Sequence, residues 1–405
     1  MKHLLLTLLS AAAFTTLPAQ TLKVHQGQVC TAFPAASIGD MTYSASGTVL
    51  TIMGHDYTLA EVDSITVDNS AYTAASVDVN YATDGKAHVT LSQDVAALLQ
   101  TSATAADVSI VAADALDTEV NYTLSGTSTD GSFYMDGSYK STFTLNNLSL
   151  ANTRGAALTV DCGKRINVVL TDGSVNTLSD ATGGTHKACF FINGHAEFKG
   201  NGTLNIAGNT KHAYASDEYT WFKSSFGTLN VTAAESDGLH VQQYFRQDGG
   251  TLSVSGTKGD CVDVSVTKDA TDELNGQAFL NGGTLAMTVS ADDVKGLKTD
   301  SAVTVAGGTL SAEVSGLGTK GISAGTDLTI SQKTETPTAV TMNVSGTTYH
   351  KDQDDESKCR GIKVKGNFTF DGGTISMNVT GKKAKGISVD GTYTYVSGTT
   401  NVLPE

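Results

Sequence analysis

The amino-acid sequence predicts an all-β protein, a right-handed parallel β-helix preceded by a small N-terminal β segment. The first observation behind this prediction is a Gly-Thr-Leu tripeptide, or a close variant of it, that recurs along the second half of the chain. Each copy precedes a short segment in which apolar and polar residues alternate, as in a strand with one buried face. Gly is frequent, at 42 of 405 residues, whereas Pro is rare, at 4. That balance suits a fold of tight corners and fully paired strands, because Pro would interrupt the hydrogen-bonded ladders.

The chain begins with a segment that predicts export. Residues 1–19 combine a basic start at Lys2, an apolar stretch from Leu4 to Leu17 and a small residue, Ala19, where a peptidase would cut. This is the layout of a secretory signal peptide. No later apolar run approaches the length of a membrane helix. We therefore expect a secreted, periplasmic or cell-surface protein without a membrane span.

The five cysteines are odd in number and widely spaced in the sequence. Neither a disulfide framework nor a CxxC metal site follows from such spacing. We expect buried free thiols that pack as small apolar side chains.

Three regions follow the signal peptide. Residues 20–76 contain short hairpin-like pieces, Thr48–Met53 and Ile65–Asp68, and predict a small β segment. Residues 77–140 alternate more regularly and predict a β cap or the first coils. Residues 141–405 hold the repeats and predict the β-helix itself.

The repeats have the period of one solenoid coil. Successive Thr residues of the tripeptide are separated by 25, 23, 33, 25 and 65 positions. A further unit around Thr341 divides the last gap, and two long loops, 268–281 and 348–359, account for the longer spacings. The copies are Gly202-Thr203-Leu204, Gly227-Thr228-Leu229, Gly250-Thr251-Leu252, Gly283-Thr284-Leu285, Gly308-Thr309-Leu310 and Gly373-Thr374-Ile375.

A coil of 23 to 25 residues with two or three short strands stacks on its neighbour at about 4.8 Å, so equivalent residues form ladders. Leucine-rich repeats need Asn and helical segments, propeller blades need a longer period, and calcium rolls need GGxGxD repeats. None of these patterns is present, and a stacked sandwich is the remaining alternative.

The net charge narrows the choice of partner. Lys and Arg number 26 and Asp and Glu 41, so the balance is 26 − 41 = −15. This argues against nucleic acid, because phosphates need clustered cations. The acidity is uneven: residues 1–294 carry 14 − 30 = −16, and residues 295–390 carry 12 − 10 = +2.

One position in each coil, just before the second strand, carries a charge. Its predicted ladder changes sign along the stack: Asp237, Asp260, Lys295, Lys320, Arg360 and Lys385. Asp263, Asp292 and Asp293 lie close to its acidic end in the sequence. Clustered carboxylates repel one another unless a cation neutralises them, and Ca²⁺ takes six to eight oxygen ligands. The alternatives are pairing with Lys258, Lys295 or Lys298, or solvation.

The four cations of this ladder could bind the carboxylates of uronic sugars, since stacked Lys and Arg side chains repel one another without an intervening anion. The alternative is a solvated row that pairs with Asp300, Asp327 and Asp390.

Aromatic side chains are concentrated in two coils. Tyr214, Tyr219, Trp221 and Tyr244 are candidates for sugar binding, because sugars stack on aromatic faces. The competing hypothesis is an aromatic stack inside the solenoid.

No catalytic residue is predicted. The sequence has no GxSxG elbow, His212 and His240 lack ligand-spaced His partners, and no hydrolase arrangement of Asp residues is evident. A lyase would need a Lys or Arg base beside bound Ca²⁺, which Lys258, Lys295 or Lys298 could supply.

The region from Leu145 to Ile387 is similar to a known protein family. Three segments carry the similarity: 173–180, 202–213 and 233–239. The region resembles the bacterial carbohydrate-binding parallel β-helix family, whose members bind cellulose or pectin and contain calcium. The resemblance implies a pectate-lyase-like fold, bound Ca²⁺ and affinity for polysaccharide without assigned catalysis. The Asp-Gly-Ile units of the family match only Asp237 and, with Cys261 in place of Gly, Asp260.

We therefore expect an exported, non-catalytic protein that binds plant-type or acidic polysaccharides with Ca²⁺ support near Asp237, Asp260, Asp263, Asp292 and Asp293. A Ca²⁺-dependent polysaccharide lyase is the alternative, and a surface adhesin or structural protein is a further one.

Overall fold

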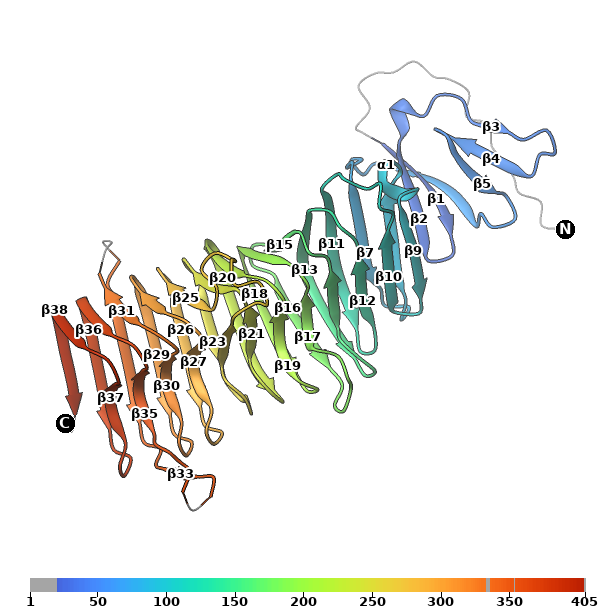
Figure 1. Ribbon diagram of the computed structural model, residues 1–405. Coiled ribbons are helices and arrows are strands. Elements are labelled where there is room, and N and C mark those ends of the chain that lie inside the picture. The colour runs from blue at the N-terminus through green and yellow to red at the C-terminus, as the bar shows by residue number, and fades with distance from the viewer. Residues whose placement is uncertain (1–19, 333–335, 353, 404–405) are drawn as a thin grey trace.

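The computed structural model describes residues 20–332, 336–352 and 354–403 and is an elongated stack of strands (Figure 1). Within these residues the strands form two large sheets of 21 and 12 strands and two small ones of 3 and 2 strands. The all-β prediction is confirmed. The predicted signal peptide, residues 1–19, lies outside the described residues. No helix in the described ranges is long and apolar enough to cross a membrane.

The N-terminal end carries a small β unit with an apolar core of its own. Strand β1 pairs antiparallel with both β2 and β6, and β3, β4 and β5 form the three-stranded sheet. Phe33, Leu50 and Ile52 are at the centre of its core. The elements are β1 (Thr21–Gln26), β2 (Val29–Pro34), a 3₁₀ turn (Ala35–Ser37), β3 (Thr42–Tyr43), β4 (Val49–Ile52), β5 (His55–Thr58) and β6 (Ser64–Asp68).

Two antiparallel hairpins come between this unit and the coils. Strands β7 (Ser76–Tyr81) and β8 (Ala87–Ser92) form the first, and β9 (Leu99–Thr104) and β10 (Asp107–Ala112) the second, with the short helix α1 (Gln93–Ala96) between them. β7 pairs parallel with β11 and β10 pairs parallel with β12, so each hairpin begins one ladder of the stack. Hairpins therefore cover the N-terminal end of the core.

From residue 120 onward every interstrand pairing within the two large sheets is parallel and joins consecutive coils. The 12-stranded sheet continues through β12 (Ser132–Asp136), β14 (Leu158–Asp161), β17 (Ala188–Ile192), β19 (His212–Ser216), β21 (Leu239–Gln242), β24 (Val262–Ser265), β27 (Lys295–Thr299), β30 (Lys320–Ala324), β35 (Arg360–Val364) and β37 (Lys385–Val389).

The larger sheet contributes two ladders, which the long strands connect by passing around a corner. β18, for example, pairs with β15 through its first half and with β16 through its second. Its strands from residue 120 onward are β11 (Val120–Ser128), β13 (Ser141–Asn152), β15 (Arg165–Leu170), β16 (Val175–Asp180), β18 (His195–Gly208), β20 (Thr220–Ala234), β22 (Tyr244–Gln247), β23 (Thr251–Val254), β25 (Gln277–Leu280), β26 (Thr284–Val289), β28 (Val303–Val305), β29 (Gly308–Val314), β31 (Leu328–Ser331), β32 (Thr338–Val344), β36 (Phe368–Val379) and β38 (Tyr393–Leu403).

The Gly-Thr-Leu tripeptide marks the corner between these two ladders. Gly283 and Gly308 have φ angles of 78° and 79°, and a Cβ on either would lie 2.4 Å from a glycine carbonyl oxygen of the preceding coil. Only Gly fits that space. The tripeptides stack in register, but one predicted alignment is wrong: Ala339, not Thr341, lies opposite Thr309 and Thr374. A shift by two residues keeps the same side chains inside, so the alternating pattern cannot detect it.

A single apolar core extends from Val77 to Val379. The five cysteines are buried free thiols, as predicted. The longer spacings correspond to connections between β24 and β25 and between β32 and β35, and the second of these holds the hairpin of β33 (Tyr349–His350) and β34 (Glu356–Ser357).

Candidate functional site

The predicted charged ladder exists, on the 12-stranded sheet. Lys295, Lys320, Arg360 and Lys385 are direct Cα partners in consecutive coils. Asp237 and Asp260 occupy the same position, two residues before Leu239 and Val262, which pair with Leu297. The stacking of these six residues is confirmed, and their roles stay predictions.

One further titratable residue of this ladder, His212, was not predicted as part of it. His212 precedes Asp237 by one coil, because Tyr214 pairs with Leu239. A second ladder three residues further on in each coil holds His240, Asp263 and Lys298. His212 and His240 are 28 positions apart, which is one coil plus that offset of three. The coil period was the signal that could have placed them together.

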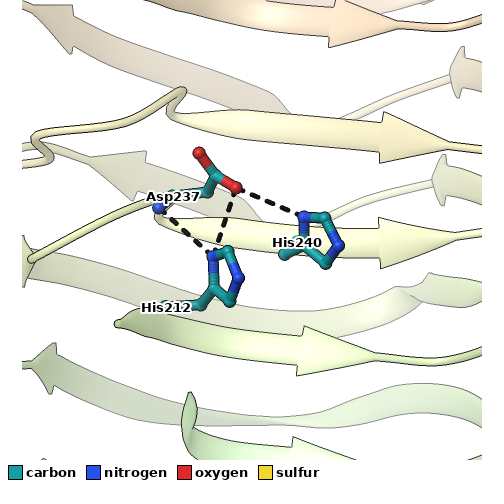
Figure 2. Close-up of side chains that lie close together, drawn as sticks. All are labelled: His212, Asp237 and His240. Atoms are coloured by element: carbon teal, nitrogen blue, oxygen red, sulfur yellow. Dashed lines mark hydrogen bonds and ion pairs between the residues drawn. The ribbon is translucent and has the colours of Figure 1, made fainter. Parts of the chain in front are cut away.

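The two histidines meet at Asp237 (Figure 2). Both Nδ1 atoms lie 3.2 Å from the same carboxylate oxygen, Oδ2, and the rings stack with centroids 4.4 Å apart. Burial alone would raise the pKa of Asp237, but hydrogen bonds from His212 and His240 hold it well below its usual range. The group is thus an ionised carboxylate between two imidazoles.

A second carboxylate continues the cluster. Asp263 Oδ2 lies 2.9 Å from His240 Nδ1, and its Oδ1 accepts a hydrogen bond of 2.8 Å from Lys298. Burial opposes the charge on His240, yet its bonds to Asp237 and Asp263 raise its pKa to about 9. His212 is more deeply buried, and burial lowers its pKa. The two rings therefore differ in charge at neutral pH.

Asp260 is the least stabilised acid of the set. It is buried, with 9% of its surface exposed, and its Oδ1 accepts the backbone N–H of Lys295 at 2.7 Å. Burial raises its pKa to about 6, and the Lys298 ammonium is 3.9 Å away.

Asp292 and Asp293 belong to a turn with partners of its own. Asp292 accepts the backbone N–H of Leu317 at 2.9 Å. Asp293 pairs with Lys351 at 2.8 Å and with Lys320 at 3.6 Å. Partial burial opposes its charge, but the bond from Lys351 and the nearby cations lower its pKa to about 2.

These surroundings do not match calcium. Ca²⁺ requires six to eight oxygen ligands, whereas Asp237 and Asp263 face imidazole nitrogens and an ammonium group. Among the described residues, the group with three potential ligand atoms within 4.8 Å of one another is His212, Asp237 and His240. Calcium at the five acids stays a prediction, and the local donor chemistry does not favour it.

The basic half of the ladder is differently arranged. Lys320 donates to the carbonyl of Gly318 at 2.7 Å, and Arg360 Nη1 donates to the carbonyls of Cys359 at 2.6 Å and Lys383 at 3.3 Å. Within the described ranges no carboxylate lies within the 4.0 Å of an ion pair from Lys295, Arg360 or Lys385, in contrast to the acidic half. Lys320, Arg360 and Lys363 line a surface cavity of about 310 Å³ with residues 356–358 and Ser388.

The acids considered as partners for this row are engaged elsewhere. Asp300 accepts the backbone N–H of Val266, Asp327 accepts that of Asn367, and Asp390 pairs with Lys363.

The aromatic candidates separate between the inside and the outside of the stack. Tyr214 is 1% exposed and hydrogen-bonds to Thr220 in the core, so its place in a sugar-binding surface is corrected to a core position. Tyr219 and Tyr244 are half-buried on the outer face and stack with centroids 4.6 Å apart, continuing a stack that begins at His195. The internal-stack hypothesis thus holds for Tyr214 but not for Tyr219 and Tyr244.

Trp221 lies on the same outer face with cations on its ring. Lys223 Nζ is 2.9 Å from the ring centroid and the Arg246 guanidinium carbon 4.2 Å, and the indole N–H donates to Asp248 at 2.8 Å. The face combines aromatic edges, hydroxyl groups and charges of both signs.

Comparison with known proteins identifies the family to which the chain belongs. A family model described as "carbohydrate-binding domain-containing protein" matches residues 104–403, which span the coils and part of the second hairpin. The chain belongs to this family. The resemblance to carbohydrate-binding β-helix proteins is thereby confirmed.

The chain is also similar to a solved structure described as the polysaccharide lyase-like protein from C. thermocellum, in a gadolinium derivative. The two are 15% identical with a TM-score of 0.45, and the match covers 80% of this chain and 98% of that one. A search of the curated proteins finds no match.

Proposed function

We propose that the protein is an exported, non-catalytic binder of acidic polysaccharides, and that the row Lys295, Lys320, Arg360 and Lys385 contacts their carboxylates. One observation supports this most directly: four cations stack in consecutive coils, and only Lys320 has a carboxylate within ion-pair distance among the described residues. Export itself rests on residues 1–19, and the right-handed coil on the usual hand of parallel crossovers.

The electrostatics of the row favour an external anion. Neighbouring coils are about 4.8 Å apart, so cations at this spacing repel one another strongly where burial lowers the dielectric. Burial, the largest effect on both groups, lowers the pKa of Lys320 and the pKa of Arg360. Carboxylates along a polymer would remove both penalties, and a guanidinium binds them in a bidentate manner.

The cavity beside Arg360 has room for part of such a polymer. Its volume of about 310 Å³ lies at the lower end of the range for ligand pockets, and cations from β30 and β35 line it. The outer face of Tyr219, Trp221 and Tyr244 lies on the other large sheet and is a second candidate contact for sugar rings.

The lyase alternative requires an unprotonated base. Lys298 is close to two acids, and although burial opposes its charge, the bond to Asp263 raises its pKa. A lysine held protonated in this way is a weak base at neutral pH, which supports binding without catalysis.

Affinity measurements on the mature full-length chain test the proposal. Isothermal titration with polygalacturonate and with neutral cellulose oligomers compares the wild type with the double variant Lys320→Gln/Arg360→Gln. Lys86→Gln, an exposed lysine of the β7–β8 hairpin loop, is the matched control. We expect binding to the acidic polymer alone, at least tenfold weaker in the double variant and unchanged in the control.

Equal affinity of the double variant and the wild type would refute the role of the row. Unsaturated product absorbance on polygalacturonate would instead identify a lyase. Binding to host proteins but to no glycan would identify an adhesin.

A further inference from the structure

Three side chains from two adjacent coils place potential metal ligands around one point. His212 begins β19, and Asp237 and His240 flank the start of β21 in the next coil. One ring nitrogen of each histidine and one carboxylate oxygen lie within 4.8 Å of one another. Figure 2 shows the three side chains gathered around the Asp237 carboxylate. No part of the proposed polysaccharide contact uses this cluster.

The spacing of these atoms matches the ligand shell of a small tetrahedral ion. With Zn–N and Zn–O bonds of about 2.1 Å, two ligand atoms of a tetrahedron are about 3.4 Å apart. The separations from Asp237 Oδ2 to each Nδ1 are 3.2 Å. Calcium, with bonds of about 2.4 Å and six or more oxygens, needs a larger and purely oxygen shell.

A further carboxylate on the third coil lies beside the cluster and contacts His240. Asp263 Oδ2 lies 2.9 Å from His240 Nδ1, on the side of His240 away from the coil of His212. Lys298 fixes the other oxygen of Asp263, and the backbone N–H of Asp260 fixes Asp237 Oδ1 at 2.8 Å. Outer contacts of this kind orient ligands in metal sites.

The nitrogen donors are positioned for coordination. His212 Nδ1 lies 3.3 Å from the backbone nitrogen and 3.2 Å from the carboxylate Oδ2 of Asp237, so this ring nitrogen faces Asp237. His240 has 26% of its side chain exposed, which provides an entry path and room to turn its ring. The rings, now 17° from parallel, must tilt for both lone pairs to meet one ion.

We infer that His212, Asp237 and His240 bind a Zn²⁺ ion that joins adjacent coils, with the fourth position of the tetrahedron left open. Imidazole and carboxylate together suit zinc and neighbouring transition metals, whereas calcium prefers oxygen alone. The site differs in residues and ligand chemistry from the basic row, so metal binding and glycan binding are separable.

The experiment uses the full mature chain without a histidine tag, stripped with chelator and dialysed against Zn²⁺ alone. We expect one zinc per chain by elemental analysis and a rise in melting temperature with Zn²⁺ but not with Ca²⁺. The variant His240→Gln should bind zinc at least tenfold more weakly. His88→Gln removes a histidine that also contacts an aspartate, Asp84, at 2.9 Å, and should behave as the wild type.

Cobalt provides a readout that does not depend on stability. Co²⁺ in a tetrahedral nitrogen and oxygen shell absorbs strongly in the visible range. This absorption should appear in the wild type and in His88→Gln and be absent from His240→Gln. The inference is overturned if the protein dialysed against Zn²⁺ retains no zinc, if His240→Gln retains as much as the wild type, or if equimolar Ca²⁺ displaces the zinc.

Discussion

The two halves of the charged ladder occupy equivalent backbone positions in successive coils, but their charges are neutralised to different extents. In the early coils each charge has an opposite charge or an imidazole within the protein, as at Asp237 and Asp263. In the late coils Lys295, Arg360 and Lys385 have no carboxylate within ion-pair distance in the part of the chain that the structure describes. The same scaffold thus carries an internally neutralised end and an end where three of the four cations lack a carboxylate partner among the described residues.

The largest expected effect separates the halves by stability. Asp237→Ala removes a partly buried carboxylate that accepts bonds from two histidines and one backbone N–H. Loss of one partner from such a buried group costs about 3 kcal/mol of unfolding free energy. Lys385→Met removes an exposed cation of the basic half and should change stability by less than about 1 kcal/mol. Urea unfolding followed by circular dichroism compares the two, and equal losses would contradict the distinction.

A second prediction separates the halves by salt. The proposed contact joins the cations of the row to carboxylates of the polymer, so raising NaCl from low to high concentration should weaken the affinity for polygalacturonate about tenfold. The unfolding free energy of the glycan-free protein should change far less, because buried pairs are screened weakly. Titration calorimetry at several salt concentrations measures the first quantity. A salt-independent affinity would mean that the basic row is not the contact.

A third prediction concerns acid. The folded-state pKa of Asp293 is lowered to about 2, so its stabilising effect is complete above its unfolded pKa of about 4 and is lost as the pH falls through the folded value. Between about pH 4 and pH 2 the wild type should therefore lose about 1 kcal/mol more than Asp293→Asn, after allowance for the solvent exposure of Lys351. Thermal unfolding across this range checks the slope, and parallel curves would argue against the ion pair.

The smallest effect is expected at the end of the row. Lys385 is exposed in the last strand of its sheet. Lys385→Gln therefore removes a solvated charge that should contribute about 0.5 kcal/mol to the free energy of polygalacturonate binding. Polygalacturonate affinity should fall two- to threefold with unchanged stability. A loss as large as that of the Lys320/Arg360 double variant would shift the centre of the contact to the end of the stack.

The sequence was sufficient for the coils because the fold repeats a local rule. Glycine at the corner and alternation after it recur at each turn, so the register from Asp237 to Lys385 could be counted without coordinates. The predicted alignment of the coils is wrong where two positions have the same local side-chain pattern. Thr341 and Ala339 face the same way, so no side-chain pattern tells them apart.

The candidate site was harder to predict. Contacts across coils depend on the lengths of insertions and on whether each side chain points into or out of the stack. His212 and His240 share no local motif and come together only through the coil spacing. Tyr214 lies in β19 and faces the core, whereas Tyr219 just precedes β20 and is half-buried on the outside, and composition alone carries no such information. Ion pairs such as Asp293 with Lys351 involve a long connection whose path the repeat does not determine.

The hydrogen-bonded pairing of β27, β30, β35 and β37 has one more consequence. The connection between β32 and β35 carries a hairpin, yet Lys320 and Arg360 remain direct partners across it. The distance between successive charges is therefore quantised in steps of one coil and is indifferent to the length of chain between them. Loops at the margins of this surface can therefore vary in length while the charged positions stay evenly spaced. Adding or deleting one coil would lengthen or shorten the row by one interstrand spacing.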